Sequence, residues 1–435
     1  MNKFLMGTTA LVAASAFTAP VIAAERIQLS VRGYSTQGIS YVDADRDFRF
    51  LTTESGGDVI DSGDFDTTGD YNEINFGTSS EIHFIGSLQL DNGLEVTFHT
   101  ELELEADSDA WQYYYEGNDT IDEVYVQFDG GFGRVQFGQQ DGAMDQMAVT
   151  APSTFHGHSH SDLEDRSMDP FDGVIRGGNP INTVGDLSGD HIKIIYFTPS
   201  MNGLQLGFSY TPNPCKNHTG YSECVYEEFG RNYWEASGSW AASYNNVAFE
   251  FSAGYGQGEG DSDWDDPSEW TVGANISFGG FSIGGSYRDR DSAHRHPAFG
   301  LVREPLGDGT DYQSEDWDVG ITYETGPWGF NLAYGSMERE DRRAYDWNTV
   351  YVPGVGNDEG YYDHAEEAES WTAGVTYAYG PGMQFGFGVQ TLDRDKDYRA
   401  RHFDMVPGGS PTGAAHHQNE GFDGVSVFFE NTIKF

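Results

Sequence analysis

The sequence predicts an all-β fold: a transmembrane antiparallel β-barrel of about sixteen strands, with short turns at one rim and long loops at the other. Three observations predict this fold. Apolar and polar residues alternate with a period of two over many segments, and the connections between these segments are alternately short and long. The composition also suits strands and turns rather than helices, because the chain contains 56 Gly, 29 Phe, 25 Tyr and 9 Trp.

The N-terminal segment predicts export from the cytoplasm. Lys3 precedes an apolar, alanine-rich stretch over 4–17, and the small residues Ala23 and Ala24 end it. This pattern is typical of a cleaved signal peptide over residues 1–24, and the stretch is too short to cross about 30 Å of hydrocarbon. The remainder, residues 25–435, contains no further apolar run of that kind, so we expect a single β-barrel domain there.

Alternation is clearest in the last predicted strand. Its apolar face consists of Val425, Val427, Phe429, Ile433 and Phe435. Segments near 94–104, 270–278 and 371–379 repeat the pattern. A soluble β-sandwich would give the same local alternation, but the opposite faces are rich in Gly, Ser, Thr, Gln and Glu, as a water-filled lumen requires. Aromatic residues near strand ends also fit the interfacial girdles of a membrane barrel.

The connections predict which rim faces which side of the membrane. Tight turns are predicted at 91–93, 130–132, 200–203, 245–246, 279–280, 326–328 and 380–382. Long acidic loops are predicted near 44–72, 106–120, 141–190, 212–232, 258–268, 291–314, 339–368 and 394–422. Seven turns and eight loops join sixteen strands, with short periplasmic turns and long extracellular loops as in bacterial outer-membrane barrels. Eighteen strands remain the alternative if a long loop contains a hairpin.

The formal net charge of −47 limits the partners of the chain. A nucleic-acid partner is excluded in practice, because binding phosphates requires a basic surface. The acidic residues either solvate large loops or create a field that attracts cations, and both readings stay open.

The two cysteines, Cys215 and Cys224, lie in one predicted loop. An exported chain enters an oxidising compartment, so we expect a disulfide between them. In the chain-entropy model so small a ring stabilises by at most about 3 kcal/mol, and its main effect is to fix the shape of the loop.

Four short motifs lie in the predicted hairpins and in the third long loop. They are Asn92-Gly93-Leu94, Asp122-Glu123-Val124-Tyr125-Val126-Gln127-Phe128, Gly131-Phe132-Gly133-Arg134-Val135-Gln136-Phe137-Gly138-Gln139 and Pro170-Phe171-Asp172-Gly173. Together they resemble the trimeric general diffusion porins of Gram-negative bacteria, particularly the alphaproteobacterial type. The resemblance implies a homotrimer in outer-membrane lipid and lipopolysaccharide that passes small hydrophilic solutes by passive diffusion. It also implies that Phe435 is part of the signal for the barrel-insertion machinery.

The resemblance further implies that the loop over about 141–190 folds inward and narrows the pore. A loop of this length is too long for a mere connection. Its candidate constriction acids are Asp141, Asp145, Asp162, Glu164, Asp165, Asp169 and Asp172. The resemblance also implies a basic wall that faces these acids, and strand alternation gives its lumen-facing candidates as Arg32, Arg134, Lys193 and Arg288. Because acids outnumber bases, we expect a preference for cations.

Metal sites are a further prediction. His156, His158 and His160 alternate along one segment, which suits a transition-metal site, a pH-sensitive gate or a merely polar loop. Carboxylates suited to Ca²⁺ occur in two other loops, at Asp58, Asp61, Asp64 and Asp66 and at Asp261, Asp263 and Asp265. No cofactor is required by the expected function, and Ca²⁺ is a possible ligand only.

The sequence shows no motif that indicates an enzyme. It contains no nucleophile elbow, phosphate-binding loop, dinucleotide fingerprint or zinc-protease motif. Two other functions remain open: a channel selective for sugars or divalent cations, with Trp111 and Tyr113 to Tyr115 as a stacking surface, and a calcium-binding structural or adhesive barrel.

Overall fold

The computed structural model describes residues 26–53, 59–65, 71–103, 121–158, 168–172, 174–175, 178–213, 231–260, 266–291, 311–346, 359–404 and 412–435. Side chains are not described for 47–53, 59–65, 311–312, 341–346, 359–364, 397–404 and 412–420. Within the described part of the chain, no helix is long and apolar enough to cross a membrane.

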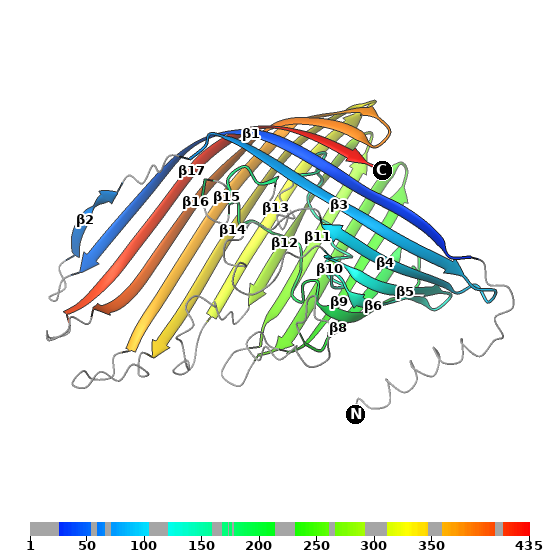
Figure 1. Ribbon diagram of the computed structural model, residues 1–435, viewed down its shortest axis with the longest axis horizontal. Helices are drawn as coiled ribbons and strands as arrows, with labels where there is room; N and C mark the ends of the chain where they lie inside the picture. The colour runs from blue at the N-terminus through cyan, green and yellow to red at the C-terminus, as the bar shows by residue number, and fades with distance from the viewer. Residues whose placement is uncertain are drawn as a thin grey trace.

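Sixteen antiparallel strands form a closed barrel. In chain order they are β1 (Gln28–Thr53), β3 (Ile74–Gln89), β4 (Glu95–Glu103), β5 (Val124–Gly130), β6 (Gly133–Gln139), β7 (Ile192–Phe197), β8 (Leu204–Thr211), β9 (Arg231–Tyr244), β10 (Val247–Glu259), β11 (Ser268–Phe278), β12 (Phe281–Asp291), β13 (Asp311–Thr325), β14 (Trp328–Asp346), β15 (Glu359–Gly380), β16 (Met383–Asp404) and β17 (Thr412–Lys434). Each strand pairs with the next along the chain, and β1 pairs with both β3 and β17 (Figure 1). The ring therefore has no free edge, and the sixteen-strand prediction is confirmed.

The prediction of a loop over 44–72 is partly wrong. Strand β1 continues to Thr53, and the additional short strand β2 (Val59–Phe65) folds back on its end, with Val59 opposite Thr53. Strand β2 pairs with the part of β1 that lies beyond its pairing with β3, while β1 stays paired with β17, so β2 adds no strand to the ring.

The loops predicted at 339–368 and 394–422 are also shorter than expected. Strand β14 extends to Asp346, β15 begins at Glu359, β16 extends to Asp404 and β17 begins at Thr412. A strand that rises past the hydrocarbon meets water on its outer face, so it loses the apolar alternation by which a membrane strand is recognised.

All seven predicted turns are present. At the Asn245-Asn246 turn both residues have positive φ, 49° and 63°, which is the type I′ geometry that matches the twist of a hairpin. Glycine supplies the same conformation at Gly279 and Gly280, with φ of 57° and 89°.

Aromatic residues form two rows on the outer surface. One row contains the ring pairs Trp234–Tyr255, Trp270–Tyr287, Trp317–Tyr334 and Tyr334–Trp371, with centroids 4.7–5.5 Å apart. The other contains Phe278–Phe281, Phe281–Tyr323, Trp328–Tyr377 and Tyr379–Phe385. On β11, Trp270 and Phe278 are eight residues apart, or about 26 Å along the strand. At a strand tilt of about 40° this is about 20 Å of height, which places both rows near the edges of an apolar band about 25 Å tall.

The inner surface is polar, and the hydrophobic core lies inside the barrel. Buried Thr36, Ser370, Thr372, Ser426 and Glu430 point away from the exposed apolar face. The core joins strands that are far apart in the chain to the segment between β6 and β7, and its members are Val42, Phe171, Ile175, Ile181, Met337, Ala368, Leu392 and Phe422. A loop therefore packs inside the barrel.

Candidate functional site

The segment that joins β6 to β7, residues 140–191, is called the inner loop below. Its first anchor is Glu235 on β9, whose carboxylate accepts hydrogen bonds from Met144 N (3.2 Å), Ser188 Oγ (2.6 Å) and Ser209 Oγ (3.0 Å). Met144 and Ser188 lie near opposite ends of the inner loop, so one buried carboxylate on the wall holds both ends.

A second anchor is Glu430 on β17, which is fully buried. Its carboxylate accepts hydrogen bonds from His156 N at 3.0 Å and Gly157 N at 3.2 Å, and His158 Nδ1 lies 2.8 Å away. The His158 ring stacks on Phe428, with centroids 3.7 Å apart and an interplanar angle of 6°. Three nitrogen atoms of the inner loop thus solvate a charge that would otherwise be expensive to bury.

The third anchor is formed by β12 and β13. Asn182 N donates to Asp316 Oδ1 at 3.1 Å, and Thr183 Oγ1 donates to Asp318 Oδ2 at 3.2 Å. Arg288 links wall and loop, because it binds Asp316 Oδ2 at 3.1 Å and the carbonyl of Val184 at 3.2 Å.

A cluster of charged side chains on β14, β15 and β16 holds the loop from another side. Arg394 donates to Gly178 O at 2.6 Å and to Glu366 Oε1 at 2.5 Å. Glu366 also lies 3.5 Å from Arg339 and 3.6 Å from Lys396. Sequence reasoning missed Arg339, Arg394 and Lys396, because it placed 339–368 and 394–422 in loops. It therefore did not ask which face of a strand these residues occupy.

Glycine residues in the wall make room for the inner loop. A β-carbon added at Gly273 would lie 1.6 Å from Val149 O, and one at Gly320 would lie 3.0 Å from Pro152 O. Val149 N donates to Ser252 Oγ at 2.9 Å, so the loop backbone runs directly against the strands here.

The predicted constriction acids are only partly brought together. Asp141 lies with Glu123 and Asp190, and one carboxylate oxygen of each lies within 4.8 Å of the others. Burial raises the pKa of Glu123 to about 7, against the opposing hydrogen bond from Asp141 N at 3.2 Å. Burial also raises the pKa of Asp141 well above its ordinary value, and the charges of Asp145 and Asp190 raise it further.

The other predicted acids have different positions. Asp169 accepts hydrogen bonds from Phe171 N at 3.0 Å and Asn179 N at 2.5 Å, while burial raises its pKa. Asp172 lies in the turn that follows. Asp162, Glu164 and Asp165 lie outside the described residues.

The four predicted basic residues lie on four different strands. Lys193 is buried and donates to Gly189 O of the inner loop, and Arg288 contacts the loop as described above. Arg134 instead pairs with Asp129 at 3.0 Å beside a short turn, and Arg32 is exposed on β1. Within the described part of the inner loop, Lys193 and Arg288 are therefore the two predicted bases that contact it.

The predicted metal ligands do not converge where they are described. His156 Nδ1 lies 3.2 Å from Thr36 Oγ1, whereas His158 faces Glu430. The other predictions of this kind lie outside the described residues or side chains, namely His160, Asp58, Asp61, Asp64, Asp66, Asp261, Asp263 and Asp265. The same applies to Cys215, Cys224 and the segment 1–24.

The C-terminal residue is integrated into the barrel. Phe435 N donates to Gly33 O at 2.9 Å, and Gly33 N donates to Phe435 O at 3.0 Å, so the chain end closes the seam between β17 and β1. Its proposed part in assembly stays a prediction.

Comparison with known proteins identifies the family. A family model described as Gram-negative porin matches residues 7–397. The chain belongs to this family. The porin is therefore an outer-membrane channel for diffusion. No curated protein matches the sequence.

Solved structures of porins resemble the chain at low identity. An anion-selective porin from Comamonas acidovorans is 16% identical with a TM-score of 0.47, and the match covers 94% of this chain and 100% of that one. The trimer form of OmpT from Vibrio cholerae is 13% identical with a TM-score of 0.45, covering 93% and 100%. A mutant of Rh. blastica porin is 15% identical with a TM-score of 0.44, covering 92% and 100%.

Proposed function

We propose that the protein is a general diffusion porin that prefers cations, with the inner loop as its constriction. The observation that carries this proposal is the group of carboxylates formed by Glu123, Asp141 and Asp190 where the inner loop leaves and rejoins the wall. Burial raises the pKa of Glu123 and Asp141, so a cation that passes the group favours the ionised form of these carboxylates, whereas an anion disfavours it.

Carboxylates cancel part of the basic charge near the inner loop, although Arg339, Arg394 and Lys396 share the single carboxylate of Glu366. Arg288 pairs with Asp316, Arg290 pairs with Glu269 at 3.5 Å, and Arg394 pairs with Glu366. A base that is paired with a carboxylate adds little net potential at a distance. The net charge of −47 for the whole chain acts in the same direction.

The test is the reversal potential of the purified porin in a planar bilayer under a salt gradient. We expect cation selectivity that decreases in the Glu123→Gln/Asp141→Asn double variant. The matched control is Asp91→Asn, which removes an exposed acid at a short turn and should leave selectivity unchanged. Anion selectivity of the wild type would refute the electrostatic argument, and a folded barrel without conductance would favour a structural or calcium-binding role instead.

We also propose that the porin is a homotrimer. Its support is the apolar outer surface of β1 and β3, where Leu29 is 72% exposed and Phe76 is 79% exposed. Side chains exposed to this degree are suited to burial by a neighbouring barrel or by lipid. The test is migration of unheated protein on a denaturing gel. A trimer band that disappears on heating and is absent in Phe76→Lys would support the subunit contact. Wild-type protein that migrates only as a monomer would exclude it.

Signal-peptide cleavage after Ala24, a Cys215–Cys224 disulfide and Ca²⁺ binding by loop acids remain part of the proposal. Intact-mass measurement of the mature chain before and after reduction tests the first two. A melting temperature that chelator leaves unchanged would remove the case for structural Ca²⁺.

A further inference from the structure

Three side chains with metal-binding chemistry meet on the inner wall at β3 and β4. Strand pairing places His83 directly opposite Glu101, and His99 lies two residues before Glu101 on the same face of β4. All three side chains point into the lumen. Ser79 on β3 lies opposite Thr36, both are buried on the inner face, and His83 is four residues further along the same face of β3. Cross-strand and diagonal neighbours on one face lie close enough for long side chains to touch.

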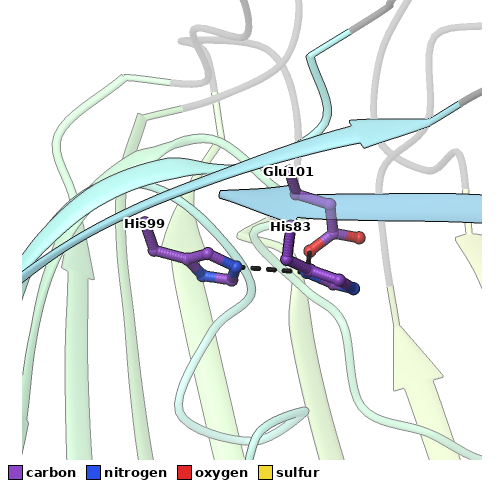
Figure 2. A group of neighbouring side chains, drawn as sticks. All are labelled: His83, His99 and Glu101. Carbon is purple, nitrogen blue, oxygen red and sulfur yellow. Dashed lines mark hydrogen bonds and ion pairs between the residues drawn. The ribbon is translucent and has the colours of Figure 1, made fainter. Parts of the chain in front are cut away.

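The three ligand atoms converge, as Figure 2 shows. His83 Nδ1 lies 3.1 Å from His99 Nε2 and 3.0 Å from Glu101 Oε2. These atoms all lie within 4.8 Å of one another. The side chains are largely buried, with exposures of 22% for His83, 12% for His99 and 10% for Glu101.

Direct hydrogen bonds use these three atoms incompletely, because His83 Nδ1 has two neighbours but can form only one well-aligned hydrogen bond. A neutral His83 carries at most one proton on Nδ1, and both His99 Nε2 and Glu101 Oε2 lie within reach of it. A metal cation, in contrast, accepts lone pairs from all three atoms at once.

The outer nitrogen of each imidazole faces a further carboxylate. His83 Nε2 lies 3.3 Å from Glu81 Oε2, and His99 Nδ1 lies 3.9 Å from Glu123 Oε2. Glu81 is itself held by the Tyr34 hydroxyl at 2.5 Å. A carboxylate that is hydrogen-bonded to the distal nitrogen is the usual support of a metal-binding histidine, because it fixes the tautomer that directs the other nitrogen's lone pair at the metal. Glu81 is near enough to His83 for this bond, whereas Glu123 acts on His99 only through its charge.

We propose that His83, His99 and Glu101 form a transition-metal site on the channel wall, suited to Zn²⁺, Cu²⁺ or Ni²⁺. Two imidazoles and one carboxylate match the preferences of these ions. Metal–ligand bonds of about 2.0–2.1 Å place neighbouring ligands about 2.9 Å apart in octahedral and about 3.4 Å apart in tetrahedral geometry. The observed separations of 3.1 and 3.0 Å fall within this range. Remaining coordination positions would be filled by water from the lumen.

Sequence reasoning placed His99 and Glu101 on one polar face but did not identify the site. His83 comes from the neighbouring strand, so the set appears only once the register of β3 and β4 is known. The inference depends on the barrel wall and not on ion selectivity, so it is tested by binding in solution, without a conductance measurement.

The experiment is titration of untagged, chelator-treated porin in detergent with Zn²⁺ by calorimetry, followed by Cu²⁺ electron paramagnetic resonance. We expect about one tight site per chain, with hyperfine splitting from two imidazole nitrogens. His99→Gln should weaken Zn²⁺ binding at least tenfold, and Glu101→Gln provides a second variant that keeps the volume and hydrogen-bonding capacity of the wall. The heat-dependent mobility of the barrel on a denaturing gel reports folding for each variant.

His156→Gln is the matched control, because His156 also lies in the lumen but contacts Thr36. It should bind Zn²⁺ like the wild type. Wild-type protein that binds no Zn²⁺ would overturn the proposal. So would binding that survives both His99→Gln and Glu101→Gln, or binding that is lost in His156→Gln, which would place the metal on the inner loop.

Discussion

The fit between the inner loop and the wall can be tested at Gly273. An added β-carbon there would lie 1.6 Å from Val149 O and 2.7 Å from the carbonyl carbon of the same residue. Carbon–oxygen contacts settle at about 3.3 Å, so Gly273→Ala requires the loop backbone to retreat by about 1.7 Å. That shift breaks the hydrogen bond of 2.9 Å between Val149 N and Ser252 Oγ.

The energetic cost follows from the same geometry. Overpacking costs about 1–3 kcal/mol, and loss of the hydrogen bond adds about 1 kcal/mol. The barrel strands are fixed by pairing on both sides, so we expect the loop to move rather than β11. The displaced carbonyl then enters the lumen and reduces conductance.

Single-channel conductance in a planar bilayer is the assay for Gly273→Ala. The control is Gly86→Ala, also a strand glycine, whose added β-carbon would meet only Ile27 Cγ2 at 3.4 Å. Conductance that is unchanged in Gly273→Ala, or equally reduced in Gly86→Ala, would refute the argument that wall glycines position the loop.

Two further predictions concern carboxylates that contact the inner loop. Burial raises the pKa of Glu123 to about 7, so acidification through that value protonates its carboxylate. Cation selectivity should therefore fall as the pH drops. Thermal stability should rise, because the folded state binds this proton more tightly than the unfolded state. The reversal potential measured over a pH series checks this, and a step at about pH 7 that persists in Glu123→Gln would contradict it. Glu430→Gln puts a neutral amide in place of the carboxylate that accepts hydrogen bonds from His156 N and Gly157 N. Hydrogen bonds to a charged group contribute about 1.5–3 kcal/mol each. Amide hydrogen exchange of these two residues should therefore accelerate at least tenfold, whereas unchanged protection would show that Glu430 is not an anchor.

The barrel itself was predictable because its signals are local. Alternation identifies a membrane strand from its own residues, and turns such as Asn245-Asn246 and Gly279-Gly280 identify themselves. These signals fail where strands leave the membrane, which is why the upper part of β15 and the short β2 were expected to be loops.

The anchors of the inner loop were not predictable to the same degree. Met144 and Glu235 are 91 residues apart, and His156 and Glu430 are 274 residues apart. Parity places Glu430 on the lumen face, but no local pattern says which loop atom it meets. The motif resemblance pointed to an inward loop, while the contacts that hold the loop emerge only from the assembled barrel.

Most bonds that hold the inner loop use its backbone. Met144, Val149, Thr154 and Asn182 are held through their N–H groups, and Val184 through its carbonyl. Every residue except proline offers the same N–H, whatever its side chain. Side chains along these stretches can therefore be exchanged without removing the bonds that attach the loop. Substitutions can thus change the side chains of the inner loop separately from the barrel that holds it.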